Sequence, residues 1–107
     1  MKTHLTLAVL AAIGLAVSVP ARAAGSAEAA KGKVSMCIGC HGIPLYRTAY
    51  PEVYHVPKIA GQTPEYIVKA LQAYKNGERG HPSMSGIARG LTDADMADLA
   101  AYYGKAK

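Results

Sequence analysis

The chain has 107 residues, of which half are hydrophobic, and a formal net charge of +5. A chain of this length is sufficient for one domain. Its lysines and arginines are scattered and do not form the basic stripe that a nucleic-acid backbone requires, so the charge gives no indication of a nucleic-acid partner.

The first 23 residues have the pattern of a cleaved signal peptide. Lys2 precedes an apolar run of 15 residues, Leu5–Val19, and Ala21-Arg22-Ala23 places small residues at both positions that signal peptidase reads. The run is shorter than the roughly 20 residues that cross a bilayer as a helix, which argues against an uncleaved membrane anchor. We therefore expect cleavage after Ala23, export to the periplasm and no stable membrane insertion afterwards.

The expected mature domain, residues 24–107, is small. Its 84 residues have a formal net charge of +3 once Lys2 and Arg22 are removed with the signal peptide. A domain of this size buries a small core and is only marginally stable unless a disulfide, a metal or a cofactor adds to it. A large apolar prosthetic group would supply the missing core.

The first predicted helix runs from about Ala27 to Cys40. Ser26 can cap it, and Glu28 places a negative charge in the first turn, where it suits the helix dipole. Its small residues would let another helix approach closely; they are Ala29, Ala30 and Gly32. The alternative is that Gly32 merely ends a short alanine-rich turn.

Cys37-Ile38-Gly39-Cys40-His41 is the attachment pattern of a c-type haem. On one turn of helix, thiols at i and i+3 face the same way, so each can form a thioether with one of the two vinyl groups of a single porphyrin. His41 then falls beneath the iron, where imidazole Nε2 is a suitable axial ligand. An exported pair of thiols this close would normally oxidise unless something consumed them, and haem attachment does so.

A second helix is predicted from Pro64 to Asn76. Thr63 caps it, Pro64 occupies the first helical position, and Gly77 supplies a left-handed stop. One apolar face is expected to be buried; it comprises Ile67, Ala70, Leu71 and Tyr74.

A third helix is predicted to start at Leu91 and Thr92 and to end at Gly104. Asp95 lies three residues beyond the cap, and Leu91 can pack on Met96 as a hydrophobic staple. Its expected buried stripe comprises Met96, Leu99, Ala100 and Tyr103.

Two long irregular stretches, residues 42–62 and 77–90, separate these helices. Both are too long to be simple connectors in so small a domain, and loops of that length usually wrap something. No segment has the alternation that predicts a sheet. We therefore expect an all-α domain with three main helices and long loops around one covalent haem.

The order of the motifs resembles that of the small mono-haem class I c-type cytochromes, in particular the short bacterial periplasmic type, which also occurs duplicated in di-haem carriers. The resemblance covers about 27–103 and is carried by Cys37-Ile38-Gly39-Cys40-His41-Gly42, Pro57-Lys58-Ile59-Ala60-Gly61-Gln62, Met84-Ser85-Gly86-Ile87-Ala88, Leu91-Thr92-Asp93 and Leu99-Ala100-Ala101-Tyr102-Tyr103. It implies N- and C-terminal helices that cross near the haem edge. Here that crossing would set Ala29 or Gly32 against Leu99, Tyr102 or Tyr103.

The resemblance also implies His41 as the proximal iron ligand and Met84, in the loop 82–86, as the distal ligand. A thioether opposite a histidine favours ferrous iron and raises the potential. His81 is the rival distal ligand and would give a bis-histidine haem, whereas His55 is expected on the surface or near the propionates. Two other methionines are excluded: Met36 adjoins Cys37 and cannot reach across the haem plane, and Met96 belongs to the helix stripe.

Pro57 resembles the family's proline whose backbone carbonyl accepts the Nδ1 proton of the proximal histidine, a bond that would fix the ring of His41. Other side chains can reach the haem propionates, or can equally be ordinary half-buried residues. These candidates are Tyr46, Tyr54, Gln62, Tyr74 and Arg79.

The leading hypothesis is a periplasmic one-electron carrier that is not an enzyme and exchanges electrons with redox partner proteins. The alternative within haem proteins is an electron-transfer subunit of a larger periplasmic oxidoreductase. A thiol-disulfide oxidoreductase would use Cys37 and Cys40 but requires a βαβ context. A zinc module could recruit the two cysteines with two of His41, His55 and His81, yet it would leave Met84, Pro57 and the signal peptide unexplained.

Overall fold

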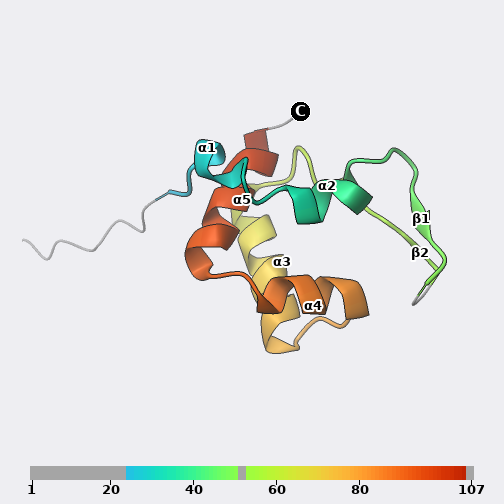
Figure 1. The fold of residues 1–107 in the computed structure, drawn as a ribbon. Coiled ribbons are helices and arrows are strands. Elements are labelled where there is room, and N and C mark those ends of the chain that lie inside the picture. Colours follow the sequence, from blue (N-terminus) through green and yellow to red (C-terminus); the bar gives the residue numbers. More distant parts are fainter. Residues whose placement is uncertain (1–23, 51–52, 106–107) are drawn as a thin grey trace, which may run out of the picture.

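The computed structural model describes residues 24–50 and 53–105, and the predicted signal peptide lies outside them. Helices dominate the described chain (Figure 1). In chain order the elements are α1 Ala27–Ala30, α2 Ser35–His41, β1 Arg47–Thr48, β2 Tyr54–His55, α3 Pro64–Asn76, α4 Pro82–Arg89 and α5 Asp93–Lys105. The all-α prediction is confirmed apart from one short hairpin, in which Arg47 pairs with His55 and Thr48 with Tyr54 in antiparallel register.

The predicted first helix is wrong as a single element, because it forms two. The Ser26 hydroxyl accepts a hydrogen bond from the Ala29 amide at 3.2 Å, as expected of a cap, but α1 ends at Ala30 and residues 31–34 form a turn before α2. Glycine destabilises a helix interior, and Gly32 stands in the middle of this turn. The alternative, a short alanine-rich turn ended near Gly32, is therefore the better description.

Both later helices begin where their capping residues predict. The Thr63 hydroxyl accepts from the Tyr66 amide at 3.3 Å, and α3 stops at Gly77, whose φ of 85° is left-handed. At α5, Thr92 and Asp95 form a reciprocal capping box: the Asp95 amide donates to the Thr92 hydroxyl at 3.1 Å, and the Thr92 amide donates to the Asp95 carboxylate at 2.8 Å.

Helix α4 lies within the stretch 77–90 that was predicted to be irregular. Pro82 occupies its first turn, the His81 side chain caps it, and Ala88 is fully buried. The glycines, histidine and proline of this stretch suggested a loop. A proline in the first turn suits a helix start, however, because its missing N–H would have no partner there.

The core lies where α5 packs on α1 and α3, while α4 packs on α3 (Figure 1). It comprises Ala30, Ile67, Leu91, Met96, Leu99, Ala100 and Tyr103. The stripe predicted for the last helix is confirmed in full, whereas Ile67 alone of the α3 face is buried. The other members of that face are only half-buried.

The terminal helices cross as the family resemblance implies, and Leu99, Tyr102 and Tyr103 take part as expected, but the residues on the N-terminal side differ. Ala29 is exposed, and a Cβ on Gly32 would meet nothing within 4 Å. Instead Ala30 is fully buried, and a Cβ on Gly25 would lie 1.9 Å from the Ala97 carbonyl oxygen. Glycine at position 25 is what allows the backbone to approach α5 so closely.

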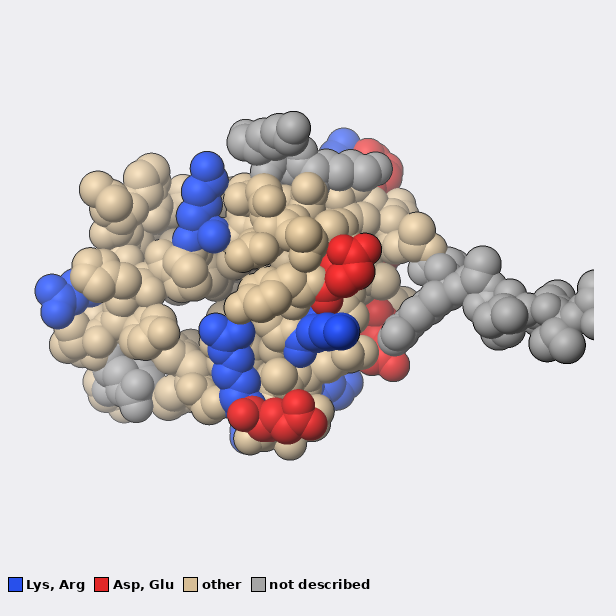
Figure 2. Space-filling view, turned by 180° about the vertical axis from the view of Figure 1, so that it is seen from behind, with Lys and Arg blue, Asp and Glu red and all other residues tan. Residues whose placement is uncertain are grey.

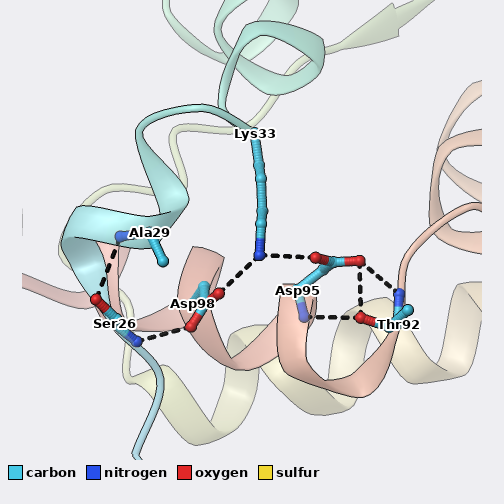
Figure 3. Close-up of polar contacts among 6 residues, drawn as sticks. All are labelled: Ser26, Ala29, Lys33, Thr92, Asp95 and Asp98. Atoms are coloured by element: carbon cyan, nitrogen blue, oxygen red, sulfur yellow. Dashed lines mark hydrogen bonds and ion pairs between the residues drawn. The ribbon is translucent and has the colours of Figure 1, made fainter.

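A group of ion pairs, the Lys33 clamp, fixes this crossing on its polar side (Figure 3). The Lys33 ammonium lies 2.7 Å from an oxygen of Asp95 and 2.7 Å from an oxygen of Asp98. The Ser26 amide donates to the second oxygen of Asp98 at 2.7 Å. Hydrogen bonds from Lys33 hold the pKa of both carboxyls below the ordinary range, and the two carboxylates raise the pKa of Lys33.

Candidate haem site

Helix α2 presents Cys37, Cys40 and His41 to one pocket of about 230 Å³. No residue of α2 is buried, and the thiols of Cys37 and Cys40 form no disulfide. Within the described ranges, α2 is absent from the main helix-to-helix contacts and reaches the core chiefly through Cys37 at its start. It is thus a helix whose inner side chains face a space instead of a packed neighbour.

Apolar side chains from three further helices line the rest of this pocket. In Figure 1, α2 lies on one side of the region and α4 on the other, with the β1–β2 hairpin at its outer end. The helical wall comprises Tyr66, Ile67, Ala70, Leu71 and Tyr74 of α3, Met84 and Ile87 of α4, and Leu99 and Tyr103 of α5. Such a lining suits a large, flat apolar ligand.

The orientation of His41 is fixed from the following loop. Its Nδ1 lies 2.6 Å from the Pro57 carbonyl oxygen, and because a carbonyl can only accept, Nδ1 is the donor. In the neutral ring the other nitrogen, Nε2, then carries a free lone pair. This is the tautomer that a metal-bound imidazole requires, with the ring held by a backbone acceptor.

Met84 and its rival His81 both line the pocket, but they are held differently. Met84 is the third residue of α4 and not a loop residue as expected, and its amide donates to His81 Nδ1 at 3.5 Å. The His81 ring also packs edge-on against Tyr54, with centroids 5.3 Å apart. His81 is therefore engaged as a helix cap, whereas the half-buried Met84 thioether makes no hydrogen bond to any described residue.

The remaining histidine and methionine candidates for the iron differ in their position relative to the pocket. His55 is exposed on β2 and does not line the pocket. Met96 is fully buried in the core, as its place in the helix stripe predicted. Met36 lines the pocket beside Cys37.

Tyr103 closes the inner end of the pocket next to Cys37. Its hydroxyl is buried and makes no hydrogen bond of normal geometry to any described residue, and burial raises the pKa of Tyr103 to about 12. Burial likewise raises the pKa of the Cys37 thiol. A thiol kept neutral in this way is a poor nucleophile, which is the opposite of what thiol-disulfide exchange needs.

The polar rim of the pocket is built around Arg79. Its guanidinium lies 4.9 Å from the Tyr74 ring centroid and donates to the Tyr66 hydroxyl at 3.3 Å, which raises the pKa of Arg79. Four of the five predicted propionate candidates line the pocket; they are Tyr54, Gln62, Tyr74 and Arg79, whereas Tyr46 does not.

Sequence reasoning missed Tyr66 and Lys58 in the pocket lining. The signal for Tyr66 was present, because it stands two helical turns before Tyr74 on α3 and so shares its face. Lys58 had no comparable signal beyond its place next to Pro57.

The structure lends no support to a zinc site or to a thiol-disulfide oxidoreductase site. In residues 24–50 and 53–105, no group of three or more His, Cys, Asp or Glu side chains is placed to hold a metal ion, as a zinc module would need. The only strands in those ranges are two residues each, so no βαβ unit surrounds Cys37 and Cys40. Across the same residues, no helix has the length and apolarity to cross a membrane.

Comparison with known proteins defines the family. The cytochrome c family model matches residues 27–106. Cytochrome c4 of Pseudomonas aeruginosa is 38% identical over 87 residues, which are 81% of this chain but 41% of that protein. Cytochrome c-554(548) of Halomonas halodenitrificans is 39% identical over 83 residues, covering 75% of this chain and 95% of that protein. The cytochrome subunit of sulfide dehydrogenase of Chlorobaculum tepidum is 37% identical over 68 residues, covering 64% of this chain and 57% of that protein.

The chain therefore belongs to the cytochrome c family. The predicted class I cytochrome c fold is confirmed. The chain spans less than half the length of the cytochrome c4 relative and nearly all of cytochrome c-554(548). The pocket described above fits the haem that the family implies, because two thiols at helical spacing, an oriented imidazole and an apolar wall meet there.

Proposed function

We propose that this protein is a periplasmic one-electron carrier with a single haem c bound covalently to Cys37 and Cys40. A haem c supplies the Fe(III)/Fe(II) couple; the protein supplies attachment, two axial ligands and a dry pocket. One cysteine pair and one pocket with the required lining support a single haem per chain. The predicted signal peptide, cleaved after Ala23, supports export to the periplasm.

The axial ligands of this proposal are His41 and Met84. The observation that carries it is the 2.6 Å hydrogen bond from His41 to the Pro57 carbonyl, which engages Nδ1 and leaves Nε2 available to an iron, while Met84 lines the same pocket from α4. The Pro57 carbonyl makes His41 a stronger donor, and the Met84 thioether, a soft neutral ligand, favours ferrous iron. With both axial positions filled by protein, we expect no enzymatic activity toward peroxide or oxygen.

Absorption spectroscopy of the exported protein tests the assignment. The protein is produced in a periplasm with haem-maturation machinery, and its spectra are recorded oxidised and reduced. We expect covalent haem and the weak band of sulfur bonded to ferric iron. Met84→Ala should abolish that band, lower the potential and let carbon monoxide bind. The matched variant Met36→Ala, also in the pocket, should keep the band and the potential of the parent and should not bind carbon monoxide.

Two results would contradict parts of the proposal. A colourless protein would show that no haem is attached. A Met84→Ala variant with unchanged spectrum and potential would show that Met84 is not the distal ligand and would favour His81 in that role. Mass spectrometry of the intact periplasmic protein checks the cleavage site and the number of haems at the same time.

The second candidate is a haem c subunit of a larger periplasmic oxidoreductase. One relative is itself named as a cytochrome subunit of sulfide dehydrogenase, which favours this alternative over other enzyme-associated roles. Size-exclusion chromatography of the native protein from its own periplasm distinguishes the two. Elution as a small monomer supports the free carrier, and elution within a stable larger complex supports the subunit.

A further inference from the structure

His81 contacts three residues at the start of α4. Its ring Nδ1 accepts a hydrogen bond from the Met84 amide at 3.5 Å, and its carbonyl oxygen accepts from the Ser85 amide at 2.8 Å. The first bond is long and therefore weak by itself. Because Nδ1 is the acceptor, Nε2 carries the proton of the neutral ring, so neither nitrogen offers a lone pair to a metal. In this arrangement His81 acts on the backbone of the proposed distal ligand.

The third contact, with Tyr54, supports the His81 ring from the hairpin. The two rings pack edge-on, with centroids 5.3 Å apart and an angle of 66° between their planes. Such a contact is favourable for aromatic rings and restricts the rotamers that the imidazole can adopt. The ring contact therefore keeps Nδ1 directed at the first turn of α4, where the long bond alone would hold it weakly.

This ring contact joins two walls of the pocket. Tyr54 belongs to β2, whereas His81 precedes α4, and both side chains line the pocket. Among the described elements, neither strand of the hairpin packs extensively on a helix. Figure 2 shows an opening between the hairpin end, on the left, and the rest of the molecule. The pair of Tyr54 and His81 therefore connects the hairpin to the helix that carries Met84.

The Met84 side chain has little other support. It is half-buried, its thioether makes no hydrogen bond to any described residue, and it rotates about three side-chain bonds. A neutral thioether is a ligand that can leave an iron and return to it. How long it stays bound depends on how well the surrounding contacts hold it in the bound position.

We propose that His81, supported by Tyr54, is a positioning residue for Met84. The cap fixes the backbone of α4 at the ligand and so slows dissociation of the thioether from the iron. This inference rests on the proposed function, in which His41 and Met84 are the axial ligands. It gives the hairpin a role in the lifetime of the distal bond.

Cyanide binding to the ferric, haem-loaded protein tests this role. Cyanide takes the distal position only after the thioether has left, so at high cyanide the binding rate approaches the rate of Met84 dissociation. His81→Ala removes the cap and the ring together and should raise this rate roughly tenfold. His81→Asn keeps a capping side chain without the ring and should raise the rate about threefold. Tyr54→Leu removes only the ring contact and should have an effect of similar size.

A double-mutant cycle separates the ring contact from other effects of Tyr54. Tyr54→Leu should add nothing in the His81→Asn background, because the ring that Tyr54 contacts is already absent. The band of sulfur bonded to ferric iron gives a second measurement. On warming, it should be lost at a lower temperature in His81→Ala than in the parent.

Two control variants exclude a general loss of stability. Tyr50→Leu makes the same substitution at an exposed residue of the hairpin turn that does not line the pocket. Thr63→Ala removes a cap from α3, a helix that bears no proposed ligand. Thr63→Ala should lower the unfolding temperature, yet both controls should keep the cyanide rate within about twofold of the parent. Circular dichroism establishes that each variant is folded.

Three outcomes would overturn the proposal. Equal cyanide rates in the parent, His81→Ala and Tyr54→Leu would exclude the positioning role. A rate that rises as much in Thr63→Ala as in His81→Ala would reduce the effect to general stability. A parent without the sulfur band, together with a high-spin ferric spectrum of His81→Asn, would show instead that His81 is the distal ligand, which overturns the proposed axial ligation as well.

Discussion

The two ends of this molecule are stabilised in different ways. At the end where α1, α3 and α5 meet, side chains from distant parts of the sequence fill a core, and the Lys33 clamp ties the crossing together. At the other end, α2 has no buried residue, and the hairpin exposes its apolar side chains. The comparison shows that the polypeptide itself completes the first end, and it leads us to expect that the second end depends on the proposed haem.

The largest expected effect comes from removing the haem attachment. Replacing Cys37 and Cys40 together by alanine should cost most of the folded protein recovered from the periplasm, because binding of the cofactor is coupled to folding of α2 and its loop. Far-ultraviolet circular dichroism and hydrogen exchange measure the result, with Ser35→Ala on α2 as the control. Normal yield of a folded, colourless protein would show that the α2 end does not need the haem.

A smaller effect, confined to the packed end, is expected from a core truncation. Met96 is fully buried and does not line the haem pocket, so Met96→Ala should destabilise the haem-loaded protein by about 2–5 kcal/mol. Ile38, on α2, is 53% exposed, and Ile38→Ala should change stability by less than about 0.5 kcal/mol. Denaturant unfolding compares the two variants. Equal losses would mean that the two ends are packed alike.

The smallest expected effect concerns the Lys33 clamp and its dependence on pH. Because Lys33 lowers the pKa of Asp95 in the folded state, the clamp stabilises the protein above the ordinary carboxyl pKa of 3.8 and loses this contribution as pH falls through the lowered value. The stability difference between the parent and Lys33→Met should therefore be constant near neutral pH and shrink below about pH 4.

Thermal unfolding as a function of pH measures this difference. Lys31→Met is the control, since Lys31 pairs only with the well-exposed Glu28. A difference for Lys33→Met that stays constant down to the lowest pH would contradict the role of the clamp.

Local signals in the sequence predicted the helix ends well. Thr63, Gly77 and Thr92 mark boundaries that the structure has, because a cap depends on hydrogen bonds within a few residues. The same local rules missed α4, since the glycines and proline of the stretch 77–90 suggested a loop, although Pro82 and the His81 cap suit a helix start and α4 also packs on α3. They also joined α1 and α2, which separate at a turn around Gly32.

For the candidate site, the cysteine and histidine pattern and the family resemblance predicted the residues that the structure brings to one pocket. Cys37, Cys40, His41, Pro57 and Met84 all line it. The haem ligands themselves stay a prediction that the spectra must test. The sequence did not indicate that His81 caps the helix bearing Met84 or that Tyr103 meets Cys37, because both depend on how α4 and α5 are placed.

The sequence by itself determined the family, the haem attachment motif and most helix boundaries, since each is encoded in residues close together in the chain. Only the tertiary structure decided which residues make the helix crossing, with Gly25 and Ala30 in place of Ala29 and Gly32, and which apolar residues remain exposed once the pocket is accounted for. These depend on contacts between segments up to 72 residues apart, such as Ser26 with Asp98, whose geometry no local pattern specifies.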